Sequence, residues 1–307
     1  MEALILAPDS VPLTRDIADY PEGIIIPIDK PYRWTSADVI RKVKYAAIRH
    51  FGKKNLKVGH AGTLDPLATG VLLVCIGKAT KLAEELQSHD KEYIAGVTFG
   101  ATTPSYDLEK EIDRFFPFEH ISAETVSEAL PQFLGEQDQV APLFSAKSVD
   151  GVRAYELARK LYKANSENES VQSSELDTAA EQLLRVSKIN ITELELLQFT
   201  GGVCGLQNNP SHYVGPSPCG QGGSTVLQTA NTTASSRINV TDNSALGLPR
   251  AEIRMACSKG TYVRAFARDL GEALGSGAHL DSLQRSRSGI FRVENALSVE
   301  EAIQKLQ

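Results

Sequence analysis

The sequence predicts an α+β protein in which strands and helices are interleaved along the chain. Two stretches indicate strands: the apolar run Val71–Ile76 suits a buried strand, and Lys91–Phe99 alternates like a strand. Residues after Ser36 indicate a helix, because apolar side chains recur there at helical spacing, at Val39, Ile40, Val43 and Ala47. These patterns predict the elements but not the order of the strands in a sheet.

Length and composition set the broad class. A chain of 307 residues suits one large domain or two smaller ones, and 42% hydrophobic residues can bury a substantial core. The longest apolar stretch is too short to span a bilayer, and the N-terminus has no signal-peptide pattern, so we expect a cytoplasmic protein that does not bind membranes. The net charge of -6 argues against indiscriminate binding of nucleic acids.

Positive charge is nevertheless concentrated in two runs. Between Asp38 and Asp65 there is no acidic residue and there are seven basic ones, and the acid-free run 282–293 contains Arg285, Arg287 and Arg292. Local patches of this kind can bind phosphates on a protein that is acidic overall. For either run alone, a solvated basic surface is an equal alternative.

The first part of the chain is predicted as follows. Residues 1–22 form an N-terminal extension, and Gly23–Ile28 forms the first strand. Ser36 is the expected N-cap of the helix that follows. A loop over residues 53–62 then leads to Asp65.

The remainder alternates in the same way. Helices are predicted over 79–86, 121–133, 262–274 and 297–307, and strands over 185–199 and 250–257. Two stretches interrupt the pattern: residues 164–182 are polar and acid-rich, and residues 200–248 are nearly uncharged and aperiodic. We interpret both as insertions, the second within a hairpin, and we expect disorder in the longer one.

Asp65 is the strongest candidate for a reactive group. It ends a glycine-rich polar loop, precedes Pro66, and lies at the edge of the apolar run that starts at Val71. Proline restricts the backbone of the residue before it, so the carboxylate is held in place. An acid in this position can be tuned by partial burial and a nearby cation, although a turn or helix cap is the ordinary alternative.

Several separated motifs resemble the TruB family of tRNA pseudouridine synthases, which isomerise the T-loop uridine at tRNA position 55. The motifs are IDKPYRWTS from Ile28, GHAGTLDPLATG from Gly59, the triplet Lys91-Glu92-Tyr93, CSKGTYVRAFARDLG from Cys257, and GSGAHLDSLQRSRSG from Gly275. The resemblance implies a mixed, largely antiparallel sheet with flanking helices and a central catalytic cleft. It implies a catalytic domain over 23–302 and a tail over 303–307, with the separate C-terminal RNA-binding domain of many members expected to be absent.

The resemblance also implies roles for single residues. Asp65 would be the nucleophile, Tyr93 would stack on the target base and relay a proton, and Arg264 would keep Asp65 charged. His60, Tyr93, Tyr262 and Leu283 would bind the substrate. Each has an ordinary alternative: Tyr93, Tyr262 and Leu283 as core packing, His60 as a support for its loop, and Arg264 as a surface residue. The segment 139–154, with Lys147 and Arg153, resembles one that closes on RNA.

The expected partner is the T-arm of tRNA, with the protein acting as a monomer and without an obligatory protein partner. The isomerisation requires no cofactor, and the six scattered histidines give no metal-ligand spacing. A protein that remodels tRNA without modifying it is the alternative from another class. A hydrolase that pairs Asp65 with Asp107 or Asp269 is a further alternative.

Overall fold

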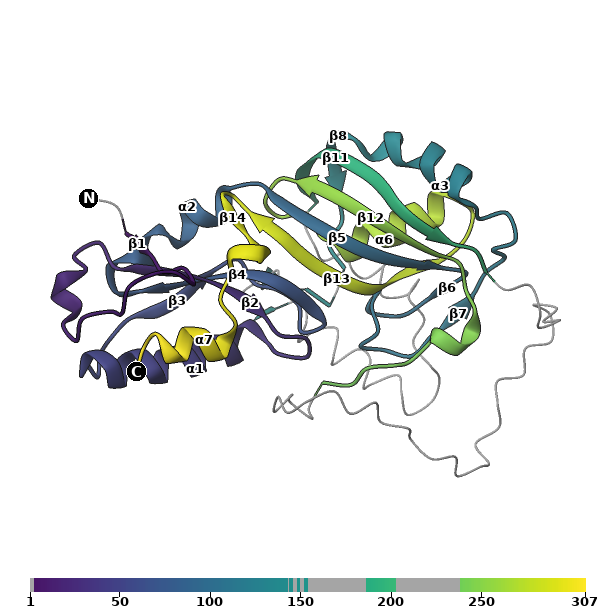
Figure 1. Ribbon diagram of the computed structural model, residues 1–307. Coiled ribbons are helices and arrows are strands. Elements are labelled where there is room, and N and C mark those ends of the chain that lie inside the picture. Colours follow the sequence, from purple (N-terminus) through teal and green to yellow (C-terminus); the bar gives the residue numbers. More distant parts are fainter. Residues whose placement is uncertain (1–2, 143, 146–147, 150–151, 154–185, 203–237) are drawn as a thin grey trace, which may run out of the picture.

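The computed structural model describes residues 3–142, 144–145, 148–149, 152–153, 186–202 and 238–307 (Figure 1). The polar insertion 164–182, most of the insertion 200–248 and Lys147 lie outside the described residues. None of the helices in the described ranges has both the length and the apolar character that a membrane crossing requires.

A ten-stranded sheet forms the body of the protein, with the strand order β1-β2-β4-β13-β5-β12-β11-β8 and with β3 and β14 as side branches (Figure 1). The strands are β1 Leu4–Ile5, β2 Ile24–Lys30, β3 Val58–Ala61, β4 Ala68–Ile76, β5 Lys91–Phe99, β8 Gly135–Gln139, β11 Ser187–Thr200, β12 Arg250–Cys257, β13 Ala278–Ser288 and β14 Phe291–Arg292. Only β1–β2 and β4–β13 pair in parallel. The predicted mixed, largely antiparallel sheet is therefore confirmed.

Two small sheets lie outside this one, β6 Ala101–Thr102 with β7 Arg114–Phe115 and β9 Ser148–Val149 with β10 Val152–Arg153. The described α-helices are α1 Ser36–Phe51, α2 Ala83–Ser88, α3 Ala123–Ala129, α6 Val263–Ala273 and α7 Val299–Gln304. Short 3₁₀ turns occupy Ile17–Asp19, Gly77–Leu82, Leu130–Phe133, Ser244–Leu246 and Val293–Asn295.

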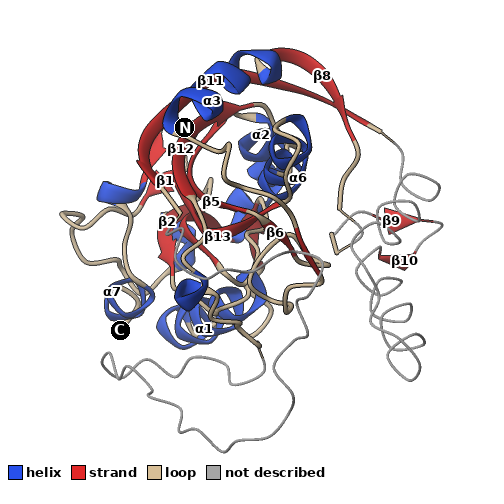
Figure 2. Cartoon of the chain, turned by 90° about the vertical axis from the view of Figure 1, so that its right-hand side faces the viewer, coloured by secondary structure: helices blue, strands red, loops and turns tan. Residues whose placement is uncertain are grey.

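One face of the curved sheet carries the main apolar core (Figure 2). Residues of α1, α3, α6 and α7 pack there against alternate residues of β2, β4, β5, β12 and β13. A smaller core on the opposite face of β2 and β4 involves α2, the turn Gly77–Leu82 and Phe291.

Most of the predicted elements are present. The alternation at 91–99 forms β5, and the strands predicted at 185–199 and 250–257 form the antiparallel pair β11–β12. The helix predicted from Tyr262 is α6, followed by Gly275 with a φ of 64°. The helix predicted over 121–133 divides into α3 and a 3₁₀ turn.

Two local predictions were wrong. The N-cap of α1 is Thr35 instead of Ser36: Thr35 and Asp38 exchange side-chain and backbone hydrogen bonds in a capping box. Residues 58–61, predicted as part of a loop, form the strand β3 that pairs with β4.

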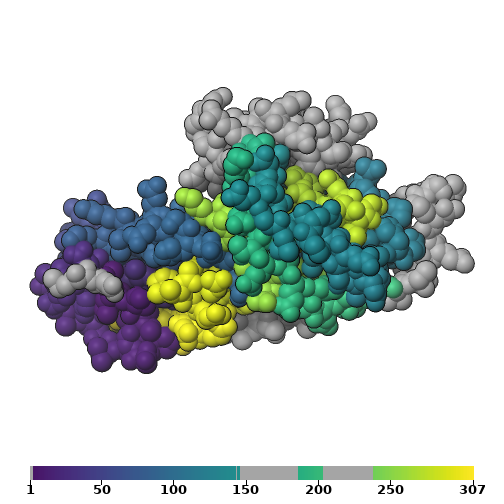
Figure 3. Space-filling model, turned by 90° about the horizontal axis from the view of Figure 1, so that it is seen from above, coloured from purple at the N-terminus to yellow at the C-terminus, as the bar shows by residue number. Residues whose placement is uncertain are grey.

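Both ends of the described chain pack on the sheet. The segment before residue 23, predicted as an extension, contributes β1 and the fully buried Leu6. At the other end, Leu306 is buried, and Lys305 donates hydrogen bonds to the carbonyls of Pro8 and Ser10. Figure 3 shows the yellow C-terminal part of the chain against the purple N-terminal part. These contacts make both segments part of the same packed unit.

Candidate active site

The loop that carries Asp65 is fastened on both sides of the acid. The Ser36 hydroxyl accepts a hydrogen bond from the Leu64 N–H at 3.0 Å and donates one to the Leu64 carbonyl at 3.1 Å. On the other side, the Pro66 carbonyl accepts from the Lys30 ammonium at 3.2 Å and from the Arg33 N–H at 3.0 Å. Asp65 is therefore held between two fixed neighbours.

Lys30 is completely buried, and its ammonium group also donates to the carbonyls of Pro31 and Trp34. Burial lowers the pKa of Lys30 to about 7, although Asp65 and Asp29 oppose this shift. A buried lysine bonded to three carbonyls joins the end of β2, the start of α1 and the Asp65 loop.

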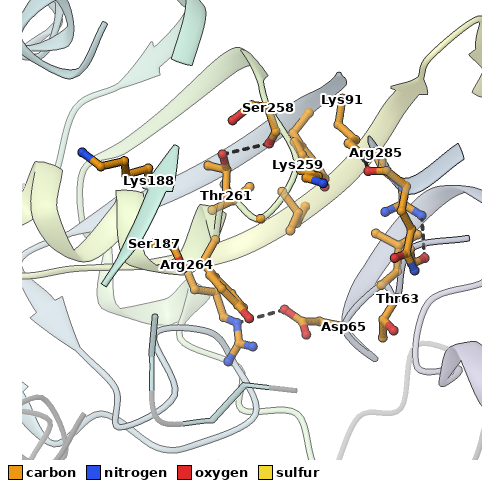
Figure 4. Close-up of a pocket in the computed structure, with 18 residues that line it drawn as sticks. Thr63, Asp65, Lys91, Ser187, Lys188, Ser258, Lys259, Thr261, Arg264 and Arg285 are labelled. Carbon is orange, nitrogen blue, oxygen red and sulfur yellow. Dashed lines mark hydrogen bonds and ion pairs between the residues drawn. The ribbon is translucent and has the colours of Figure 1, made fainter. Parts of the chain in front are cut away.

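The Asp65 carboxylate pairs with a buried arginine. Its Oδ2 lies 2.9 Å from Nε of Arg264, and the two side chains are 39% and 6% exposed, respectively (Figure 4). The Arg264 guanidinium donates further hydrogen bonds to the carbonyls of Ser105 and Phe144. The cation is fixed in the protein while the anion remains open to solvent, which suits an acid that must react with a substrate.

A second carboxylate lies on the far side of Arg264. Oδ2 of Asp107 is 3.6 Å from Nη1 of Arg264, and the Asp107 side chain is 9% exposed. Burial raises the pKa of Asp107, as does the charge of Asp65, whereas Arg264 lowers it. For Arg264 burial has the opposite effect and lowers the pKa, but Asp65, Asp107 and Glu109 together raise it above its usual value. The site is a carboxylate–guanidinium–carboxylate arrangement with one exposed end.

Asp65 lines an open cavity of about 610 Å³, whose wall also includes residues of β5, α6 and β13 (Figure 4). Four other predicted site residues, Tyr93, Tyr262, Arg264 and Leu283, line the same cavity. His60 lies on β3 and does not line the cavity, and its buried Nδ1 has no hydrogen-bond partner among the described residues. The structure thus brings five of the six predicted residues around one cavity.

Tyr93 and Tyr262 enter the cavity from different elements. Burial raises the pKa of the Tyr93 phenol, while the neighbouring Arg285 lowers it. Tyr262 is the N-cap of α6. The side-chain amide of Gln139 accepts a hydrogen bond from the Tyr262 N–H and donates one to the Tyr262 carbonyl. Burial also raises the pKa of Tyr262, so both phenols are protonated at neutral pH.

Sequence analysis placed Arg285 in a basic run that either binds phosphates or forms a solvated surface, and it did not identify this residue as buried. Arg285 is 2% exposed, and its guanidinium donates to the carbonyls of Val71 and Gly62 at the wall of the cavity. Gly70 allows the backbone of Arg285 to lie close to β4, because a Cβ at Gly70 would lie 2.3 Å from the Arg285 carbonyl oxygen, and the φ of Gly70 is 96°. Lys91, also at the cavity wall, has a pKa lowered to about 8 by burial and by Arg285.

The hydrolase alternative requires a second acid, Asp107 or Asp269, beside Asp65 in the cavity, and neither residue lines the main cavity. Asp107 approaches Arg264 but does not line the main cavity, and Asp269 pairs with Arg268 at 2.7 Å. Among the described residues, no group of three or more histidine, cysteine, aspartate or glutamate side chains is arranged to hold a metal ion.

Solved structures of ribonucleoprotein and Cbf5 complexes contain chains with a similar fold. A solved structure titled "Structure of H/ACA RNP bound to a substrate RNA containing 2'-deoxyuridine" matches with a TM-score of 0.51 at 19% identity, covering 92% of this chain and 53% of that chain. Another, of a Cbf5-Nop10-Gar1 complex, matches with a TM-score of 0.50 at 20% identity, covering 95% of this chain and 60% of that chain. At these identities the likeness concerns the fold alone.

The family follows from the sequence comparisons. Residues 49–192 match the model of the TruB family pseudouridylate synthase N-terminal domain. The tRNA pseudouridine synthase B of Phocaeicola vulgatus is 44% identical over 92% of this chain and 92% of its own length, and that of Flavobacterium johnsoniae is 39% identical over 93% and 98%. The chain belongs to the TruB family of pseudouridylate synthases.

Proposed function

We propose that this protein isomerises uridine 55 in the T-loop of tRNA to pseudouridine, with Asp65 as the nucleophile. The observation that carries the proposal is the Asp65 carboxylate, exposed at the cavity wall and paired at 2.9 Å with the buried Arg264. Membership of the TruB family and the relatives named tRNA pseudouridine synthase B support the same reaction.

The cavity suits a nucleotide that has left its stack. An enzyme that acts on a base extrudes it into a pocket and reads it by stacking and hydrogen bonding. Tyr93, Tyr262 and Leu283 supply flat or apolar surfaces around Asp65, and Arg285 and Lys91 supply positive charge beside it. His60, on the strand next to the cavity, would support the RNA backbone when the base leaves its stack.

The chemistry breaks the bond between N1 of uracil and the sugar and forms a bond from C5 to the same sugar carbon. Ionised Asp65 starts the reaction, either by attack on the sugar carbon or by abstraction of a sugar proton. The detached uracil turns and re-bonds through C5. This step breaks the bond between Asp65 and the sugar carbon or, in the second route, is followed by return of the proton from Asp65 to the sugar. The ring then gives up the C5 proton, while N1 gains one. Atoms and oxidation level are conserved, so the reaction requires neither a redox cofactor nor a phosphate donor.

The environment of each side chain fits its role. Arg264 holds and orients the Asp65 carboxylate, because the guanidinium is itself held in place by two carbonyls and Asp107. Tyr93 is a protonated phenol that can stack on uracil. To relay the C5 proton, it must release its own phenolic proton as it accepts the one from C5. We further propose that the protein acts as a cytoplasmic monomer without an obligatory protein partner.

The function is tested by incubating purified protein with an unmodified tRNA transcript and mapping pseudouridine by carbodiimide labelling. A transcript with cytidine in place of uridine 55 is the control. We expect label at position 55 of the first transcript and none in the second. Tight binding of tRNA without any new pseudouridine would contradict the proposal and favour a tRNA-remodelling protein.

A further inference from the structure

Helix α1 leads away from the catalytic loop along the surface of the protein. Its first residue, Ser36, is bonded to Leu64 beside the reactive acid, and the helix then continues for sixteen residues, roughly 24 Å. It packs on the same face of the sheet as α6. Because Leu64 lines the cavity, α1 begins beside the cavity and leads away from it.

That solvent side carries a line of cationic and aromatic side chains, here called the α1 stripe: Arg41, Lys42, Lys44, Tyr45 and Arg49. Arg41, Tyr45 and Arg49 are spaced four residues apart and so lie along one side of the helix. The Arg41 and Tyr45 side chains are highly exposed, and the Arg49 guanidinium lies 5.8 Å from the centre of the Tyr45 ring. The stripe thus presents an exposed aromatic ring among four cations.

Little negative charge compensates the stripe. The helix contains one acid, Asp38, which is used in the capping box and pairs with Arg41. In the part of the chain that the structure describes, Lys42, Lys44 and Arg49 form no ion pair. Tyr45 is 66% exposed and covers no core, so packing does not account for it.

A hollow of about 580 Å³ lies between the stripe and α7. Tyr45 and Arg49 line it together with Arg15 from the N-terminal segment. The cationic surface is therefore concave at its far end, and it joins side chains that are distant in sequence.

We propose that the α1 stripe binds the phosphate backbone of the helical stem that leads away from the target loop of the RNA. This inference rests on the proposed function, which puts the loop in the cleft. The stem must leave the cleft over its rim, and α1 begins at that rim and continues outward. Lysine and arginine bind phosphates without reading sequence, and an arginine-flanked tyrosine can pack on a ribose or an exposed base.

The test uses two RNAs with the same loop: a hairpin with its short stem only, and the same hairpin lengthened by a further turn of helix. The variant is Lys44→Ala/Tyr45→Ala/Arg49→Ala, which alters only exposed side chains. The matched control is Arg114→Ala, because Arg114 is also an exposed arginine over an aromatic ring, 4.7 Å from the centre of Phe116, and lies on β7 at the other end of the sheet (Figure 1).

We expect the triple variant to bind the long hairpin about tenfold more weakly, with the slope of log K against log salt reduced by about two. The short hairpin and the Arg114→Ala protein should bind as in the wild type, and kcat should be unchanged. Equal loss for both hairpins, or no loss for either, would overturn the inference; no loss for either would favour an acidic protein as the partner of the stripe. The binding readout needs no turnover, so a wild-type protein that binds but does not isomerise contradicts the proposed function separately.

Discussion

Two buried arginines border the same cavity, and they differ in what neutralises them. Arg264 is paired with Asp65 and Asp107, whereas Arg285 donates to the carbonyls of Val71 and Gly62. Among the described residues, no carboxylate lies within ion-pair distance of Arg285. The uncompensated charge of Arg285 lowers the pKa values of Lys91 and His60, which are already lowered by burial.

The difference divides the cavity into two halves with separate tasks. On the Arg264 side the cation is neutralised by carboxylates of the protein, and this arrangement holds the carboxylate of Asp65, the proposed nucleophile, in place. On the Arg285 side the positive charge has no protein anion opposite it, so it is available to the phosphate or the uracil oxygens of the substrate. The first side should control kcat, and the second should control substrate binding.

Replacing Arg264, the arginine that is paired with carboxylates, should have the largest effect on kcat. Arg264→Gln leaves Asp65 and the buried Asp107 without their cation, so we expect kcat to fall by about a thousandfold and the free energy of unfolding by about 3–5 kcal/mol. Single-turnover rates and urea unfolding measure both effects, and a kcat within threefold of wild type would refute the assignment.

Replacing Arg285, the arginine without a carboxylate partner among the described residues, should weaken substrate binding. Arg285→Met should lower kcat/KM by about a hundredfold, mainly through KM, because it removes charge from the substrate side. It should also raise the pKa of His60, which can be followed by NMR titration of the imidazole. A loss confined to kcat would show that the two halves are not separate in this way.

Lys91 tests the same half of the cavity through pH. Its pKa of about 8 lies below the ordinary value, so the ammonium loses its proton as pH rises through 8, and the cavity then loses a positive charge. RNA affinity of an inactive Asp65→Asn protein should fall about threefold to tenfold between pH 7 and 9. The same protein with Lys91→Met should bind more weakly and show a flatter profile. Identical profiles for the two proteins would contradict the assignment.

The smallest expected effect concerns the support of the loop. Ser36→Ala removes both hydrogen bonds to Leu64 and should lower kcat about tenfold and stability by about 1–2 kcal/mol. Thr35→Ala, in the adjacent residue, removes the cap of α1 at a stability cost of about 1 kcal/mol and should leave kcat unchanged. If both variants lost kcat equally, Ser36 would support only the helix.

The parts of this account that the sequence predicted are those with a regular pattern or a separated motif. The alternation of β5 and the periodic apolar residues of α1 predicted these elements, and the motif resemblance identified five residues that line one cavity. β13 was not predicted as a strand because bulges between Leu280 and Ser282 and between Arg285 and Arg287 break its alternation. The first bulge lets Leu280 and Leu283 face the same side of the sheet.

The sequence could not predict which groups the individual side chains contact across the fold. Nothing local to Ser36 indicates that it bonds to Leu64 across the fold, and its position beside Thr35 favours a helix cap equally well. Arg285 appears in a basic run with Arg287, and only the pairing of β13 with both β4 and β5 makes it a buried residue. Segments 164–182 and 203–237 lie outside the described residues, and their predicted character as insertions stays a prediction.

The central claim is that the exposed carboxylate of Asp65, and not its buried counterpart Asp107, attacks the nucleoside. The most direct measurement is single-turnover pseudouridine formation by Asp65→Asn and Asp107→Asn with saturating protein and one tRNA transcript, with binding measured alongside. We expect Asp65→Asn to bind the transcript normally and to lose activity by at least about ten thousandfold, and Asp107→Asn to lose about a hundredfold. Turnover by Asp65→Asn within tenfold of the wild type, or equal losses in the two variants, would contradict the claim.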